Sequence, residues 1–284
     1  MRSEQEIMSL VMDFAEMDER VRVVGMNGSR TNDRVKKDLF QDYDIVYIVK
    51  DMSSFIRNKD WIDYFGKRLI LQTPEAMTLY PATLGNWFSY LMLFEDGNRI
   101  DLMLIPLEEL DAYLGGDDSL TKILLDKDDR IREKPIPNDR DYHVKKPSAA
   151  EFDDCCNEFW WVTTYVAKGL CRKEFLFAAD HFEKIVRKEL FRMLEWKVGV
   201  ETNFQLSVGK SHKYLDKYVS KDVWNRILTT YKLDSITACW DALYIAIQLF
   251  RETSIELAKN FGYHYPDYDE KMSGYLIELQ KFDS

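Results

Sequence analysis

The chain has 284 residues, of which 46% are hydrophobic, enough for a packed core in one large domain or two ordinary ones. No apolar stretch approaches the roughly 20 residues that a membrane span needs, so we expect no membrane association. The formal net charge of −10 disfavours nucleic acid as a partner, because an acidic protein without a strong basic patch repels a polyanion.

The first half of the chain predicts alternating short helices and strands. Apolar residues recur at helical spacing over residues 3–18, and the β-branched run Val21–Asn27 predicts a short buried strand. The elements expected next are a short helix, a strand, a longer helix and a third strand, over Asp33–Phe40, Asp42–Val49, Ser54–Gly66 and Arg68–Thr73.

A β-hairpin is expected after these elements. Two apolar runs, Trp87–Phe94 and Arg99–Ile105, flank Asp96-Gly97, which is a strong local signal for a hairpin turn. A short helix over Leu107–Tyr113 and an edge strand within Leu120–Ile131 complete this half of the chain.

A polar, proline-containing stretch over Asp128–Pro147 predicts a linker. Beyond it strand signals disappear, and long helical patterns cover about Ala149–Gly169, Lys173–Val198, Lys221–Tyr231, Ser235–Phe261 and the chain from Asp267. We therefore predict an α+β protein. Residues 1–146 form a domain with a mixed β-sheet flanked by helices, and residues 147–284 form a helical bundle.

Cysteine usage indicates a reducing compartment. The four cysteines form no Cys-x-x-Cys pair, which disfavours a zinc site. The N-terminus also lacks a basic region followed by an apolar core, as a secretory signal would have. We therefore expect a cytoplasmic protein with reduced thiols, and a monomer or a weak dimer.

Three aspartates occur within apolar strand patterns. Asp42 and Asp44 are two residues apart, so their side chains share one face with Cβ atoms roughly 6–7 Å apart. Asp101 lies inside the second hairpin strand. If that strand lies beside Asp42–Val49, the three carboxylates meet on one face, where hard oxygen ligands suit one or two Mg²⁺ ions.

Gly28-Ser29, at the end of the first strand, is a candidate phosphate site. Glycine lets a phosphate approach the backbone, a helix start favours anions, and Ser29 offers a hydroxyl and an amide. Arg30 adds a fixed positive charge for a triphosphate. Each feature alone also has a structural explanation, because Gly-Ser is common in turns and Asp-x-Asp can be a solvated strand start.

The combination of Gly28, Ser29, Asp42, Asp44 and Asp101 resembles the nucleotidyltransferase superfamily to which DNA polymerase β belongs. The resemblance implies that the first two acids bind metal and triphosphate. It also implies that the third binds metal and helps to activate, or itself deprotonates, the acceptor hydroxyl.

A narrower resemblance, to the aminoglycoside 6-adenylyltransferases, rests on the stretches "GSRTND", "FQDYDI", "NRIDLMLIP" and "EFWWVTTYVAKGL" and covers essentially the whole chain. It implies transfer of AMP from ATP to position 6 of streptomycin with release of pyrophosphate. The second domain would then bind this small cationic aminoglycoside.

The helix expected after Pro147 carries candidate acceptor-binding residues. Asp154 and Glu158 share a face, with Glu151 one turn earlier, and would pair with guanidinium groups. Trp161 would stack on a sugar or guanidinium plane, although packing in the core explains a tryptophan equally well. Asp180 is a further candidate of the same kind.

Lys168, at the end of the same helix, is a candidate for the β- or γ-phosphate. Complementing the helix dipole is an equally good explanation for a lysine there.

Two other functions stay open from the residues alone. One is the same chemistry on another small-molecule or protein acceptor. The other is a non-catalytic nucleotide-binding module, which loss of a metal carboxylate would indicate, but all three are present.

Overall fold

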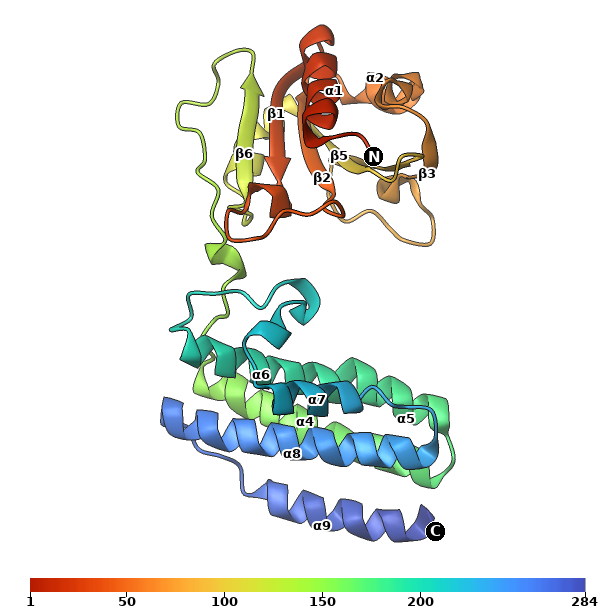
Figure 1. The fold of residues 1–284 in the computed structure, drawn as a ribbon, viewed down its shortest axis with the longest axis vertical. Coiled ribbons are helices and arrows are strands. Elements are labelled where there is room, and N and C mark those ends of the chain that lie inside the picture. The colour runs from red at the N-terminus through yellow and green to blue at the C-terminus, as the bar shows by residue number, and fades with distance from the viewer. Residues whose placement is uncertain (284) are drawn as a thin grey trace. The chain divides into compact units, whose positions relative to one another are not determined.

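The computed structural model describes residues 1–283, which fall into two compact units. The N-terminal unit spans Met1–Asp141 and the C-terminal unit begins at Tyr142, whereas the sequence-based division was placed at residue 146. All strands lie in the N-terminal unit, and the C-terminal unit is helical (Figure 1). The predicted α+β class is confirmed.

The N-terminal unit contains one six-stranded mixed sheet with the order β3-β4-β5-β2-β1-β6. Strand β2 pairs with β5 in parallel, and every other neighbouring pair is antiparallel. The strands are β1 Val21–Asn27, β2 Tyr43–Val49, β3 Arg68–Gln72, β4 Phe88–Phe94, β5 Arg99–Pro106 and β6 Thr121–Asp126.

Short helices cover this sheet. Helix α1 lies over one face (Figure 1), where Ile7 and Val11 pack with Val24 and Tyr47. The opposite face packs a smaller cluster that includes Tyr113 of α3. The helices of this unit are α1 Glu4–Met17, η1 Gly28–Thr31, α2 Met52–Arg57, η2 Asp60–Phe65, η3 Pro74–Ala76, η4 Leu107–Glu109 and α3 Leu110–Leu114, and η5 Arg140–Tyr142 includes the last residues of this unit and the first of the next.

Two helix predictions in this unit are wrong in detail. Residues 33–40 form turns rather than a helix, and Leu39 and Phe40 are 73% and 87% exposed, so a helix there would have no core to pack against. The helix expected over Ser54–Gly66 is divided into α2 and η2. Asn58 is extended there, and its side-chain oxygen accepts a hydrogen bond from the backbone of Asp60.

The C-terminal unit is a bundle around an aromatic core. Phe159 of α4 stacks on Phe250 of α8 at a centroid distance of 3.7 Å. The expected helix over Lys173–Val198 contains a π-helical turn, η6, between α5 and α6. The helices are α4 Ala149–Cys171, α5 Phe175–His181, η6 Phe182–Val186, α6 Arg187–Glu201, η7 Lys210–His212, η8 Leu215–Lys217, α7 Lys221–Thr229, α8 Ile236–Phe261, α9 Tyr268–Gln280 and η9 Lys281–Asp283.

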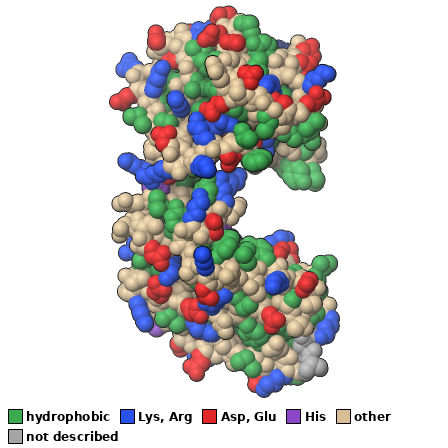
Figure 2. Space-filling view, viewed as in Figure 1, with side chains coloured by type: hydrophobic (Ala, Val, Ile, Leu, Met, Phe, Trp, Pro, Cys, Tyr) green, Lys and Arg blue, Asp and Glu red, His purple; other side chains and the backbone are tan. Residues whose placement is uncertain are grey.

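Within residues 1–283, none of the helices combines the length and apolar character that crossing a membrane requires. Acidic and basic side chains are interspersed over the face drawn in Figure 2.

Candidate active site

The parallel pairing of β2 with β5 brings two of the predicted aspartates together. Asp44 and Asp101 are direct partners in the strand register, which confirms that the hairpin strand lies beside Asp42–Val49. Asp42 directly precedes β2, and its side chain is 39% exposed. Side chains two apart on a strand share a face, so the three carboxylates lie on the same side of the sheet.

These carboxylates repel one another. Burial first, and then the charges of Asp101 and Asp42, raise the pKa of Asp44 to about 6. Burial also raises the pKa of Asp42. A cation bound between neighbouring carboxylates would offset their repulsion and stabilise their ionised forms. The three aspartates therefore have the chemistry of a cation site.

Arg99 is the cation that the structure brings to this group, and the sequence reasoning missed it. Its Nε and Nη2 donate to Oδ1 and Oδ2 of Asp101 at 2.7 and 2.8 Å. Its Nη1 lies 3.5 Å from Oδ2 of Asp42. The available signal was the spacing, because an arginine two residues before Asp101 on a strand faces the same way.

Metal binding by the three aspartates stays a prediction. Across residues 1–283, no group of three or more His, Cys, Asp or Glu side chains is arranged to hold a metal ion. Both oxygens of Asp101 instead accept hydrogen bonds from Arg99.

Gly28 and Ser29 lie beside the aspartates. Strand β1 ends at Asn27 and η1 begins at Gly28, which has a φ of +73°. A Cβ at position 28 would collide with Oδ2 of Asp44, so glycine is needed both for its backbone and for its size. The hydroxyl of Ser29 accepts a hydrogen bond from Gln41 at 3.2 Å.

Arg30 is buried and holds the segment that precedes β2. Its Nη2 and Nε donate to the carbonyl oxygens of Gln41 and Asp42 at 2.8 and 3.0 Å. The guanidinium also stacks over the ring of Tyr43. These contacts give Arg30 a positioning role for Asp42 that the sequence did not predict, and contact with a phosphate stays a prediction.

Asn27 on β1 lies in line with Asp44 on β2 and Asp101 on β5, and the sequence did not predict it as a site residue. It is the β1 partner of Asp44 in the strand register. Its amide donates to Oγ1 of Thr121 at 2.9 Å, and its oxygen accepts from the hydroxyl of Tyr113 at 2.7 Å. Asn27 therefore presents a fixed, fully engaged side chain next to Asp44.

In the C-terminal unit, α4 carries an exposed stripe formed by Asp154, Glu158, Trp161, Tyr165 and Lys168. The two acids and the lysine are exposed, and Tyr165 is half-buried. Trp161 is 58% exposed, and its Nε1 donates to the hydroxyl of Tyr165 at 2.9 Å. Exposure of the indole argues against a core role for Trp161.

The two other predicted acceptor ligands are engaged. Glu151 accepts hydrogen bonds from the backbone and hydroxyl of Ser148, which completes the capping box at the start of α4. Asp180 pairs with Lys184 at 2.6 Å.

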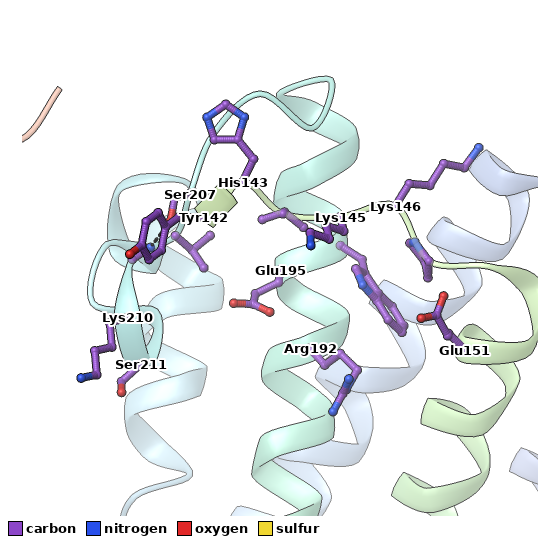
Figure 3. Close-up of a pocket in the computed structure, with 15 residues that line it drawn as sticks. Tyr142, His143, Lys145, Lys146, Glu151, Arg192, Glu195, Ser207, Lys210 and Ser211 are labelled. Carbon is purple, nitrogen blue, oxygen red and sulfur yellow. Dashed lines mark hydrogen bonds between the residues drawn. The ribbon is translucent and has the colours of Figure 1, made fainter. Parts of the chain in front are cut away.

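The C-terminal unit also contains a polar cavity of about 470 Å³. Figure 3 shows Arg192 and Glu195 on α6 beside the loop that carries Lys210. Of the predicted site residues, only Glu151 lines this cavity.

The family model described as streptomycin adenylyltransferase matches residues 1–279. A Campylobacter jejuni protein named aminoglycoside 6-adenylyltransferase is 52% identical over 99% of this chain and 97% of its own. A Bacillus subtilis protein of the same name is 50% identical over 97% of each chain, and one from Staphylococcus aureus is 41% identical over 97% of this chain and 98% of its own.

Among solved structures, the crystal structure of an aminoglycoside 6-adenyltransferase from Bacillus subtilis matches with a TM-score of 0.50. It is 45% identical, and the match covers 99% of both chains.

Proposed function

The chain belongs to the streptomycin adenylyltransferase family, and on that premise we propose that it transfers AMP from ATP to a hydroxyl group of an aminoglycoside. The names of the relatives at 41–52% identity support an aminoglycoside acceptor and ATP as co-substrate. We propose that the group that accepts AMP is the hydroxyl at position 6 of streptomycin. The observation that carries the proposal is the pairing of Asp44 with Asp101 across two parallel strands.

The oxygen donors of the three aspartates fit a hard divalent cation. Their mutual repulsion raises the pKa of Asp44 beyond the effect of burial, and a shared cation would relieve it. We propose that Asp42, Asp44 and Asp101 hold one or two Mg²⁺ ions. When bound, such ions neutralise charge on the triphosphate and favour in-line displacement at phosphorus.

Asp101 is our candidate for the general base, with its side chain 21% exposed. Its carboxylate accepts the proton of the acceptor hydroxyl, and the hydroxyl oxygen forms a bond to the α-phosphorus of ATP. The bond from that phosphorus to the bridging oxygen breaks at the same time, and pyrophosphate leaves. Aligning these groups supplies much of the rate gain.

We propose Gly28, Ser29, Arg30 and Lys168 as the residues that bind the phosphates. The turn at Gly28 supports this role. No side chain covers its backbone beside Asp44, so a phosphate group can approach the backbone closely. The exposed ammonium group of Lys168 is available to a polyanion.

For the acceptor we propose Asp154, Glu158 and Trp161, together with Glu151 and Asp180. Exposed carboxylates beside an exposed indole provide charge for a guanidinium group and a flat surface for a sugar.

The same proposal gives the two parts of the chain different roles. Residues 1–146 would carry nucleotidyl transfer and residues 147–284 the choice of acceptor. We propose a cytoplasmic monomer or weak dimer that binds no nucleic acid, consistent with the net charge of −10.

Pyrophosphate release tests the function directly. The protein is mixed with ATP and Mg²⁺ and with streptomycin, kanamycin, spectinomycin or lincomycin in separate reactions. Release is expected with streptomycin, and none with streptomycin would overturn the substrate assignment. Release with lincomycin alone would indicate another acceptor class.

Substitutions test the assigned roles. Asp42→Asn and Asp44→Asn should abolish turnover, whereas Asp13→Asn, an exposed position on α1, should not affect it. Asp101→Asn should lower kcat strongly with little change in ATP binding. Near-normal turnover in Asp42→Asn or Asp44→Asn would refute the metal assignment.

A further inference from the structure

Arg99 is a basic residue that contacts two of the three aspartates, Asp101 and Asp42. It makes a bidentate pair with Asp101, with both contacts at 2.7–2.8 Å, and it also reaches Asp42. Its charge lies close enough to Asp44 to oppose the rise of that residue's pKa. One guanidinium therefore contacts two of the three carboxylates that we assign to the cation site, and its charge also acts on the third.

The guanidinium occupies part of the acceptor capacity that a metal ion would use. Each oxygen of Asp101 accepts one hydrogen bond from Arg99, so the guanidinium takes two of the roughly four lone-pair sites of this carboxylate and puts a positive charge where a second cation would bind. Arg99 is nevertheless 42% exposed, so its side chain has room to swing toward solvent.

We propose that Arg99 is a built-in counter-cation of the catalytic carboxylates, which competes with the divalent cation for Asp42 and Asp101 until the guanidinium moves away. This inference rests on the proposed function, because it takes the three aspartates as the cation site. It adds a residue outside the three carboxylates that sets the affinity of the site for the cation.

The proposal has two consequences. Removing the guanidinium leaves its partner oxygens free, so a divalent cation should bind more tightly to the protein without nucleotide. It also leaves the carboxylates without their counter-charge when no metal is present, so the metal-free protein should melt at a lower temperature.

Arg99→Gln is the principal variant, and Arg99→Lys keeps the charge but loses the bidentate geometry. Arg130→Gln is the matched control. Arg130 is 43% exposed in the same unit and pairs with Asp128 at 3.0 Å, so its removal changes the net charge equally.

Mn²⁺ affinity of the nucleotide-free protein is measured by electron paramagnetic resonance. We expect Arg99→Gln to bind Mn²⁺ about ten-fold more tightly than the unsubstituted protein, with Arg99→Lys in between and Arg130→Gln unchanged. Melting temperature is measured in EDTA and with Mn²⁺, and Arg99→Gln should have the lower value in EDTA and the larger rise with metal.

Unchanged or weaker Mn²⁺ binding in Arg99→Gln would overturn the inference, as would an equal gain in Arg130→Gln. Neither outcome affects the proposed adenylyl transfer, which pyrophosphate release tests separately. Absence of pyrophosphate release when the unsubstituted protein is given ATP, Mg²⁺ and an aminoglycoside would instead refute the function.

Discussion

At the scale of single residues, Asp44 is the aspartate of the site whose ionised form is most strongly disfavoured. Its carboxylate is disfavoured by burial and then by its two acidic neighbours, and its pKa rises from 3.8 to about 6. A carboxyl group with a raised pKa in the folded state favours folding below its unfolded pKa and loses that contribution as the pH rises.

Asp44 should therefore make the metal-free protein less stable as the pH rises from about 4 to about 6. The shift corresponds to about 2–3 kcal/mol of unfolding free energy. Urea unfolding in EDTA at pH 4.5 and pH 7.5 measures this loss, and Asp44→Asn should remove most of it. An identical pH dependence in both proteins would contradict the raised pKa.

Gly28 is needed for two separable reasons, its left-handed backbone and its closeness to Asp44. We expect Gly28→Ala to cost about 1–2 kcal/mol of stability and, by displacing Asp44, to lower kcat about 100-fold. Gly262→Ala is the matched control, because Gly262 has a φ of +71° and open space around it.

Denaturation and steady-state kinetics are measured on both glycine variants. Gly262→Ala should lose comparable stability and keep its kcat. A similar fall in kcat in both variants would show that backbone strain, rather than the collision with Asp44, limits activity at position 28.

At the scale of elements, the sequence predicted most strands because each has its own local signal. The hairpin between β4 and β5 follows from Asp96-Gly97, and β1 from its β-branched residues. The turns over residues 33–40 were mistaken for a helix, because local patterns do not reveal whether a core is available to pack against.

The site was partly predictable for the same reason. Gly28, Ser29 and the three aspartates stand out where acids and a Gly-Ser turn interrupt apolar strands. Arg99 and Asn27 do not stand out, because polar residues at strand ends are common. Their roles depend on the parallel partner of β2 and on the register, which neither strand encodes alone.

Helix α4 supplies a test of acceptor binding, because its acids lie on an exposed face. Asp154→Asn and Glu158→Gln should each raise the KM for streptomycin about 10-fold by removing a charge-assisted hydrogen bond, with kcat and the KM for ATP little changed. Asp241→Asn, at an exposed position on α8, is the control. An unchanged KM in both α4 variants would remove this face from the acceptor site.

At the scale of the whole molecule, the two units have separate hydrophobic cores. One core gathers residues of the sheet and α1, and the other gathers residues of the helical bundle. Each unit also begins a helix with the same capping box, Ser3 with Glu6 on α1 and Ser148 with Glu151 on α4.

These paired capping boxes allow the stability of each unit to be measured separately. Ser3→Ala and Ser148→Ala should each cost about 1 kcal/mol. In urea, far-ultraviolet circular dichroism follows mainly the helical unit, and Trp61 or Trp87 fluorescence, with the other tryptophans replaced, follows the N-terminal unit. Each substitution should move only its own transition, and equal movement of both would indicate a single cooperative unit.

The parallel pairing of β2 with β5 also makes the site depend on a contact between distant parts of the chain. Asp44 and Asp101 are far apart in the sequence, and α2, β3 and β4 lie between their two strands along the chain. Closing such a loop is slow compared with forming the local contacts of a helical bundle. A chain that has formed only its local helices therefore lacks the paired carboxylates, and we expect it to be inactive until β2 and β5 pair.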